Sequence, residues 1–263
     1  MIDLTCKIAL VTGSTTGIGE AIARRLARAG ASVMIHGLIK EDAEQAAAEI
    51  KAAGGGDADC ILADLAQPSE CEKLIAATAA RFGGLHILVN NAAVMTRSDL
   101  ETTDAETFDR TIAVNLRAPL LLFRAALPYL RLGGGAVLNI GSVNGYCGEY
   151  NQLAYAISKG GLMTLSRNLA DAHGPEKIRV NHFNVGWVLT KNEYALKMKE
   201  GLPDDWPERL PPNIAPSGRL LSPEEVAEFA LLFVSGEGAL VSGAVVDLEQ
   251  YPMIGRNPRK LLA

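Results

Sequence analysis

Short apolar segments alternate with longer helical patterns along the whole chain, and this alternation restricts the possible folds more than any other feature. The first pair is "KIALVT" at 7–12, an apolar run of strand length, and "EAIARRLARAG" at 20–30, whose apolar residues recur at helical spacing. Further strands are predicted at 31–36, 59–65, 86–92, 135–142, 177–184 and 243–248, and further helices at 41–54, 69–83, 104–132, 153–172 and from Ser222 onward. Strands that are apolar throughout and separated by helices form parallel sheets with both faces covered. The sequence therefore predicts an α/β fold, a doubly wound Rossmann-type parallel sheet of about seven strands.

The chain is expected to form a single domain, 1–263, because no repeat or linker interrupts this pattern. Hydrophobic residues make up 48% of the chain, which is enough material for a core. The only long stretch without a clear pattern is at about 186–221. Irregular segments of that length in a compact domain are usually functional, so this one is predicted to be a lid over a substrate site.

Charge and composition argue against several classes of partner. The net charge is −5 and no run of Lys or Arg is present, so neither nucleic acid nor an anionic membrane is expected to bind. No apolar run reaches the ~18 residues of a membrane span, and no secretory leader is expected before the first strand. The four cysteines and four histidines are scattered, which argues against a metal site and for a reducing, cytoplasmic compartment.

A glycine-rich segment, "TGSTTGIG" at 12–19, joins the first strand to its helix. Gly13 permits the tight turn, and Gly17 and Gly19 allow the backbone to approach a pyrophosphate and the helix to pack on the strand. The helix N-terminus supplies free N–H groups for phosphate. Three glycines alone are a weak signal, but their place at the first strand–helix junction favours a dinucleotide site over a structural turn.

A tyrosine and a lysine stand four residues apart in "YAISK", Tyr155 to Lys159, one turn apart on the same face of a predicted helix. Such a pair also occurs on ordinary helix surfaces. Ser142, however, ends the preceding strand, and ligands of doubly wound sheets bind at the carboxyl ends of the strands. The three side chains are therefore expected to converge there.

Together these motifs resemble the single-domain branch of the short-chain dehydrogenase/reductase family. The resemblance covers essentially the whole chain. It is carried in order by "TGSTTGIG" (12–19), "ADL" (63–65), "NNAA" (90–93), "VNL" with Asn115, Ser142, "YAISK" (155–159) and "NVGWVLT" (184–190). The family implies a nicotinamide-dependent enzyme that interconverts a secondary alcohol and a carbonyl.

The resemblance implies a catalytic set of Asn115, Ser142, Tyr155 and Lys159. Tyr155 would be the acid–base, and Lys159 would hold the nicotinamide ribose and lower the pKa of the phenol. Ser142 would orient the substrate oxygen. Asn115 would hold a water in a proton relay, although an Asn at this place can also merely cap or kink a long helix.

The resemblance also implies a binding site for NAD or NADP along the strand ends. The residues expected to contribute are Gly13, Ser14, Thr16, Gly17, Ile18, Gly19, Leu38, Asp64, Leu65, Asn91, Ala92, Tyr155, Lys159, Gly186, Val188 and Thr190. Asn90 and Asn91 are equally compatible with a purely structural role between strands, and a loop Thr such as Thr190 needs no function.

The turn "HGLIK" (36–40) favours NAD over NADP. Relatives that use NAD often carry an acid at the position of Gly37, and those that use NADP often carry Arg at the position of Leu38; this chain has neither. A phosphate without a cation is harder to accommodate than a hydroxyl without a carboxylate. Lys40 is the objection, because it is long enough to reach a phosphate.

The substrate is expected to be small and polar: a polyol, an aldose or a short hydroxy acid. The 186–221 segment carries aromatic and polar side chains together, which suits a sugar-like ring, although lids also carry them for packing and solubility alone. Ser142, Tyr146, Trp187 and Tyr194 are the predicted substrate contacts. The ending "DLEQYP" departs from the family pattern, and Glu249 or Tyr251 is expected near the site.

The sequence leaves three alternative functions open. A 3-oxoacyl (carrier protein)-type reductase would need a basic surface for its acidic partner, and "DAHGPEK" (171–177) offers none. A non-catalytic dinucleotide-binding protein would normally have lost the Tyr or the Lys, and an extended-branch epimerase would have a shorter glycine spacing. A homotetramer is expected, from the apolar faces of 104–132 and 153–172 and a C-terminal tail that reaches a neighbour.

Overall fold

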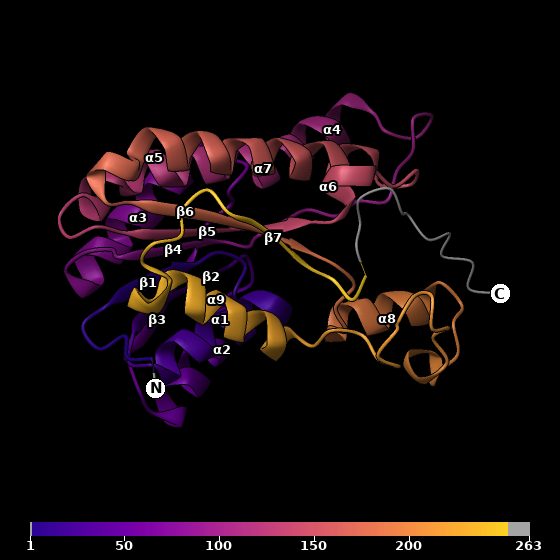
Figure 1. Cartoon of the computed structure of the whole chain (residues 1–263), viewed down its shortest axis with the longest axis horizontal. Coiled ribbons are helices and arrows are strands. Elements are labelled where there is room, and N and C mark those ends of the chain that lie inside the picture. Colours follow the sequence, from indigo (N-terminus) through magenta and orange to yellow (C-terminus); the bar gives the residue numbers. More distant parts are fainter. Residues whose placement is uncertain (1, 252–263) are drawn as a thin grey trace.

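Seven parallel strands form one sheet in the order β3-β2-β1-β4-β5-β6-β7, in a computed structural model that describes residues 2–251 (Figure 1). The strands are β1 (Ile8–Val11), β2 (Ser32–Gly37), β3 (Ala58–Leu62), β4 (Ile87–Asn90), β5 (Ala136–Ser142), β6 (Arg179–Val185) and β7 (Val245–Leu248). Every neighbouring pair is parallel. The strand order reverses between β1 and β4, which makes that point the switch of a doubly wound sheet. The predicted fold class is confirmed.

Helices cover both faces of this sheet, as Figure 1 shows. They are α1 (Gly17–Arg28), α2 (Lys40–Ala53), α3 (Pro68–Phe82), α4 (Ala105–Ile112), α5 (Ala118–Leu130), α6 (Asn144–Cys147), α7 (Leu153–His173), α8 (Lys191–Lys199) and α9 (Pro223–Val234). One buried cluster joins α1, α2 and α9 to the sheet, and a second joins α3, α5 and α7 to its other face. In β1, Ala9 and Val11 belong to the first cluster and Ile8 and Leu10 to the second. Burial on both faces explains why the strands are apolar throughout.

The predicted helix 104–132 is continuous but not uniform. A π-helical turn, Ala113–Arg117, separates α4 from α5. π-Helical turns are rare in proteins, and those that do occur are often found at functional sites. Asn115 lies within it.

The 186–221 segment is more ordered than the sequence predicts. It contains α8, a short 3₁₀ turn (Trp206–Glu208) and a hydrophobic cluster of its own. The cluster consists of Trp206, Leu210, Ile214, Ala215 and Leu220, with Trp187, Leu189 and Leu202 packed against it. Figure 1 shows α8 and the rest of this segment beyond one end of the sheet. Its aromatic residues therefore serve first to pack the segment.

A chain of polar side chains crosses the interior between the sheet and α7. It connects β4 to β7 through Asn90–Asn139 (2.7 Å), Asn139–Ser166 (2.8 Å), Ser166–His182 (3.1 Å), His182–Asn184 (3.0 Å) and Asn184–Asp247 (3.1 Å). Burial lowers the pKa of His182 to about 4, so the ring is neutral at neutral pH. This network ties the helix that carries Tyr155 to four strands.

None of the helices between residues 2 and 251 is both long and apolar enough to cross a membrane.

Candidate active site

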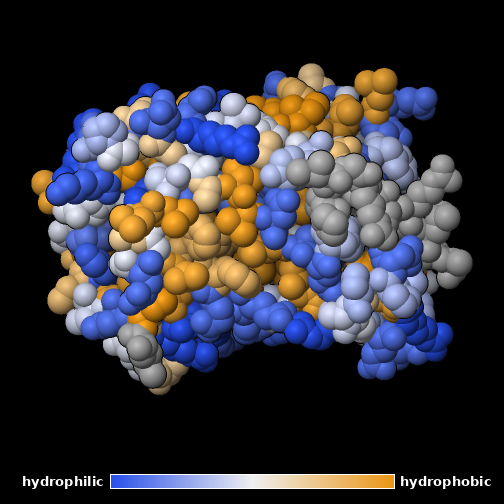
Figure 2. Space-filling model, viewed as in Figure 1, coloured by the Kyte–Doolittle hydropathy of each residue, from blue (hydrophilic) through white to orange (hydrophobic). Residues whose placement is uncertain are grey.

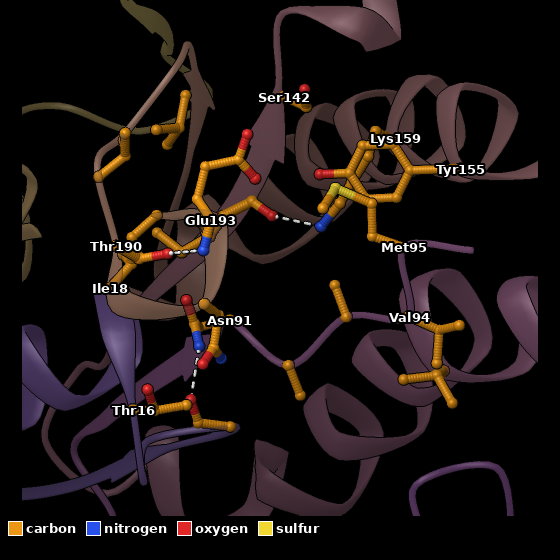
Figure 3. A pocket seen from close by; sticks show the side chains of 18 of the residues that line it. Thr16, Ile18, Asn91, Val94, Met95, Ser142, Tyr155, Lys159, Thr190 and Glu193 are labelled. Atoms are coloured by element: carbon orange, nitrogen blue, oxygen red, sulfur yellow. Dashed lines mark hydrogen bonds between the residues drawn. The ribbon is translucent and has the colours of Figure 1, made fainter. Parts of the chain in front are cut away.

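A cleft of about 1200 Å³ runs from the glycine-rich segment to Ser142 and Tyr155, along the carboxyl ends of the strands. Figure 3 shows its interior, with Thr16 and Asn91 toward one end and Ser142, Tyr155 and Lys159 toward the other. The cleft therefore joins the two ends of the site that the sequence predicts separately.

The glycine-rich segment is shaped by contacts that leave no room for a side chain. A Cβ on Gly13 would stand 2.9 Å from the Cα of Ala92, and one on Gly19 would stand 2.2 Å from the carbonyl oxygen of Gly13. Gly13 and Gly17 also have φ of 61°, in the left-handed region. The N-cap Thr16 makes no side-chain cap bond, so the first turn of α1 keeps N–H groups for a ligand. This cradle fits the pyrophosphate of a dinucleotide.

His36 holds this cradle in place, although no motif in the sequence points to it. Its Nδ1 accepts a hydrogen bond from the Gly13 N–H (2.9 Å), and its Nε2 lies 2.9 Å from the carbonyl oxygen of Ala63. Burial lowers the pKa of His36, so the ring is neutral and carries its proton on Nε2. The ring links the glycine turn to the segment that follows β3. The interpretation of "HGL" by its Gly and Leu alone overlooked it.

The end of β2 carries apolar side chains where the sequence predicts the adenosine ribose. Leu38 and Ile39 line the cleft and are 63% and 57% exposed. A Cβ on Gly37 would stand 2.5 Å from the methyl of Thr15, so an acidic side chain at this position would displace that residue. Lys40 does not line the cleft, and its Nζ lies 3.7 Å from Glu44.

Asp64 follows β3 and lines the same end of the cleft. Arg110 forms an ion pair with it (3.1 Å), and the hydrogen bond from this guanidinium holds the pKa of Asp64 below its usual value. Asp42 and Glu49 also line the cleft here. This end is thus richer in carboxylates than in free cations.

Ser142, Tyr155 and Lys159 converge at the other end. Ser142 is the last residue of β5, and the other two lie one turn apart on α7. The Lys159 Nζ donates to the carbonyl oxygen of Ile140 (2.8 Å) and lies 5.5 Å from the centre of the Tyr155 ring. Burial lowers the pKa of Lys159, which is 2% exposed, to about 8.

The pKa of Tyr155 differs from the expectation. Burial raises it to about 12, the hydrogen bond with Ser142 lowers it, and the negative charge of Glu193 raises it. Desolvation dominates, so the expected lowering of this pKa by Lys159 is not found. The hydrogen bond with Ser142 is the interaction that favours the phenolate.

Asn115 is fully engaged in structural bonds. Its Oδ1 accepts from the Val94 N–H (2.7 Å), and its Nδ2 donates to the Val94 carbonyl (2.8 Å) and to Ser158 Oγ (3.0 Å). It therefore fixes the π-helical turn to the segment after β4 and to α7. A relay through this carboxamide would require one of these bonds to open.

Most of the predicted cofactor residues line the cleft, and three do not. Ser14 is buried, and its hydroxyl donates to the carbonyl of Val11 (2.6 Å). Gly17 and Gly19 shape the backbone of the turn, but they are not among the residues that line the cleft. Asn91 both lines the cleft and donates to the carbonyls of Thr12 and Gly13, at 2.9 Å each, so its structural and binding roles coexist.

Of the predicted substrate contacts, too, some line the cleft and others do not. Ser142 and Trp187 line the cleft, whereas Tyr146 and Tyr194 lie outside its lining. The Tyr194 hydroxyl donates to the carbonyl of Asp204 (3.0 Å), and its ring stacks on Trp206. Tyr146 faces Asn184 and Asp247, at the end of the buried polar network.

Glu249 and Tyr251, from the unusual ending, do line the cleft. The Trp187 N–H donates to Glu249 Oε2 (3.3 Å). Residues 252–263, which include most of the tail predicted to reach a neighbour, lie outside the described part of the chain.

Ion pairs connect α8 to the segment after β4. Arg97 lies 2.8 Å from Glu200, and Lys197 lies 2.7 Å from the same carboxylate. Glu193 accepts a hydrogen bond from the Trp187 indole N–H (2.8 Å). These side chains line the cleft, and the sequence analysis did not single out their pairing because α8 was not predicted.

The chain is similar to several known proteins. A family model described as enoyl-(acyl carrier protein) reductase matches residues 13–249. A trans-4-hydroxycyclohexanecarboxylate dehydrogenase of Sinomonas cyclohexanicum is 32% identical and covers 97% of this chain and 95% of its own length. A D-beta-hydroxybutyrate dehydrogenase of Cupriavidus necator is 34% identical, with 94% and 97% covered. The crystal structure of an L-sorbose reductase from Gluconobacter frateurii, complexed with NADPH and L-sorbose, superimposes with a TM-score of 0.90 at 27% identity, covering 97% of this chain and 99% of that one.

Proposed function

We propose that this chain, which belongs to the short-chain dehydrogenase/reductase family of nicotinamide-dependent oxidoreductases, interconverts a secondary alcohol and a carbonyl on a small polar substrate, such as a polyol, an aldose or a short hydroxy acid. The observation that carries the proposal is the convergence of Ser142, Tyr155 and Lys159 on one cleft whose other end is the glycine cradle. The nicotinamide, when bound, supplies the hydride acceptor or donor.

Tyr155 is the proposed acid–base. With a pKa of about 12 the phenol is protonated at neutral pH, which is the form that donates a proton to a carbonyl oxygen during reduction. Oxidation needs the phenolate, which the hydrogen bond with Ser142 favours. Lys159, fixed to the Ile140 carbonyl, is placed to hold ribose hydroxyls.

NAD is the proposed cofactor, held by the glycine cradle, Asp64, Asn91 and the strand-end residues that line the cleft. At the end of β2 the cleft lining is apolar at Leu38 and Ile39, and the lining residue Asp42 would repel a 2′-phosphate.

A small polar substrate is supported by the polar lining at the chemical end, which includes Asn144, Gln152 and Glu193 together with Trp187. The compounds in the names of similar proteins are also small and polar. They are a hydroxycyclohexanecarboxylate and a hydroxybutyrate for two relatives, and L-sorbose for the structural neighbour.

A reductase of carrier-protein substrates is the second candidate, because the matching family model carries that description. An acidic carrier protein would need unpaired cations at the mouth of the cleft. Arg97 and Lys197 are instead both paired with Glu200, which favours a small free substrate.

The remaining parts of the proposal concern the whole protein: one catalytic domain with a lid at about 186–221, a homotetrameric assembly and a reducing, cytoplasmic compartment. The four cysteines are scattered along the sequence without a C-x-x-C pair, which supports the last point.

The test is a substrate panel with purified protein and each of NAD, NADP and their reduced forms, followed by nicotinamide absorbance. Polyols, aldoses, ketoses and hydroxy acids are expected to include substrates. Hydrophobic ketones or steroids with kcat/KM a hundredfold above every polar compound would refute the proposed substrate class.

A further inference from the structure

Among residues 2–251, the positive charges that line the cleft are engaged or remote from the substrate end. Within that range five Lys and Arg side chains line it: Arg97, Arg110, Lys159, Lys191 and Lys197. Arg97 and Lys197 share Glu200, Arg110 is paired with Asp64, and Lys159 donates to the Ile140 carbonyl. Lys191 is exposed and faces the Glu49 carboxylate, which lines the cleft from α2 at the cofactor end. In the described part of the chain, a substrate carboxylate would therefore find beside Tyr155 only Lys159, whose ammonium is held by the Ile140 carbonyl.

Glu193 places a negative charge at that position. It stands in the first turn of α8, where Thr190 caps its N–H (3.0 Å) and the helix dipole favours a carboxylate. Its side chain is 14% exposed and acts on Tyr155 through its charge. Figure 3 shows the carboxylate pointing into the cleft, on the side of Ser142 and Tyr155.

The two oxygens of Glu193 have different surroundings. Oε1 accepts from the Trp187 indole (2.8 Å) and lies 4.0 Å from the Lys197 Nζ. Among residues 2–251, no hydrogen bond is donated to Oε2. Trp187 is itself held from behind by Glu249, whose Oε2 accepts from the Trp187 N–H. Oε2 of Glu193 is thus an open acceptor at the substrate end, on a carboxylate that is held through Oε1.

The chemistry of a suitable ligand follows from this arrangement. A hydroxyl donates to a carboxylate, and hydrogen bonds to charged groups are stronger than neutral ones. A substrate carboxylate has no proton to donate and would be repelled by Glu193 and by Glu149 and Glu249, which also line the cleft.

We propose that Glu193 selects neutral, hydroxyl-rich substrates, a polyol or the ketose made from it, by accepting a hydrogen bond from a substrate hydroxyl at Oε2, and that it excludes hydroxy acids. This inference rests on the proposed oxidoreductase activity and narrows its substrate class.

The test compares hexitols with hexonates in the oxidation direction and ketohexoses with ketohexonates in the reduction direction. Several stereoisomers of each are used, so that within a pair the change is from a terminal hydroxymethyl group to a carboxylate. In the wild type, the best neutral substrate is expected to have kcat/KM at least roughly tenfold above that of the best hexonate. Glu193→Gln keeps Oε1 as acceptor for Trp187 and removes the charge, so it should reduce this preference by about tenfold. Glu193→Asp keeps the charge and should keep the preference.

Glu208→Gln is the matched control, because it removes a carboxylate from the same segment at an exposed position outside the cleft lining. Binding of NADH, followed by fluorescence, reports whether each variant is folded. A hexonate that outperforms every neutral substrate in the wild type overturns the inference, as does a preference unchanged in Glu193→Gln. Absence of nicotinamide turnover with all compounds, charged or neutral, would instead refute the oxidoreductase activity on polar substrates.

Discussion

Removal of the Tyr155 hydroxyl is expected to abolish the proton transfer while it leaves the cleft intact. Tyr155→Phe keeps the ring, and Lys159 remains bound to the Ile140 carbonyl (2.8 Å), so cofactor affinity should change little. Turnover should fall by ~10²-fold or more, because general acid–base catalysis is lost. Steady-state kinetics and NADH fluorescence titration measure the two quantities. Tyr129→Phe, on α5 away from the cleft, is the control. Near-normal turnover of Tyr155→Phe would refute the assigned role.

Cofactor choice is expected to depend on the charge at the end of β2. The wild type should use NAD with at least roughly tenfold higher kcat/KM than NADP, since Lys40 lies beside Glu44 and outside the cleft lining. Leu38→Arg supplies a cation for the 2′-phosphate and should raise kcat/KM with NADP by about tenfold or more. Leu38→Gln has a similar shape without the charge and should not. A wild type that is tenfold better with NADP would contradict this prediction.

At the scale of residues, the sequence predicts those side chains whose positions follow from local geometry. Ser142 ends a strand, and Tyr155 and Lys159 are one helical turn apart, so their convergence follows from the period of the helix and the edge of the sheet. His36 could not be predicted, because its partners, Gly13 and Ala63, are distant in sequence. Tyr146 and Tyr194 are near the site in sequence, but sequence proximity does not fix the direction of a side chain.

At the scale of elements, the buried network between α7 and the sheet is expected to make the protein sensitive to acid. Burial lowers the pKa of His182 in the folded chain to about 4, against an ordinary value of 6.5. Below about pH 6.5 the unfolded chain binds a proton that the folded chain does not bind until about pH 4. The contribution of His182 to stability is therefore complete above pH 6.5 and is lost as the pH falls from 6.5 to 4, by about 3 kcal/mol in all.

His182→Asn should flatten the dependence of the unfolding free energy on pH between 7 and 5, by up to about 1.4 kcal/mol per pH unit. Urea denaturation at each pH measures this slope. His36, whose pKa is also lowered by burial, remains in the variant, so the slope should decrease but not vanish. Equal slopes for wild type and variant would show that His182 is not responsible.

The sequence predicts the strands and long helices to within a few residues, because burial on both faces and amphipathic spacing are strong signals. It does not predict α8, which carries no apolar stripe and begins at a Thr190 cap within a segment that resembles a loop. The π-helical turn Ala113–Arg117 is also invisible to periodicity, since one wider turn hardly shifts the apolar pattern.

At the scale of the whole molecule, β7 ends the sheet and has no strand partner on its outer side among residues 2–251. Figure 2 shows hydrophobic side chains gathered across the middle of the face where Figure 1 places β7 and α9. Phe229 and Leu232 of α9 are 47% and 41% exposed, and Leu240 before β7 is fully exposed. An open apolar edge of this kind favours association. By contrast, α5 and α7 use most of their apolar residues in the core, and retain Leu120 and Ile157 at the surface.

We expect the protein to be a homotetramer, because a closed tetramer of two-fold symmetry uses two different self-complementary faces, and both the β7–α9 face and the α5–α7 face carry exposed apolar side chains. Light scattering at micromolar concentration should give four times the chain mass of 27.9 kDa. Leu232→Glu places a charge in the β7–α9 face and should reduce the mass to that of a dimer, since a buried unpaired charge is strongly unfavourable. Leu132→Glu, on an exposed residue (85%) in the loop after α5, should leave the tetramer intact. A stable wild-type monomer would refute the assembly, and a tetrameric Leu232→Glu would remove the β7–α9 face from it.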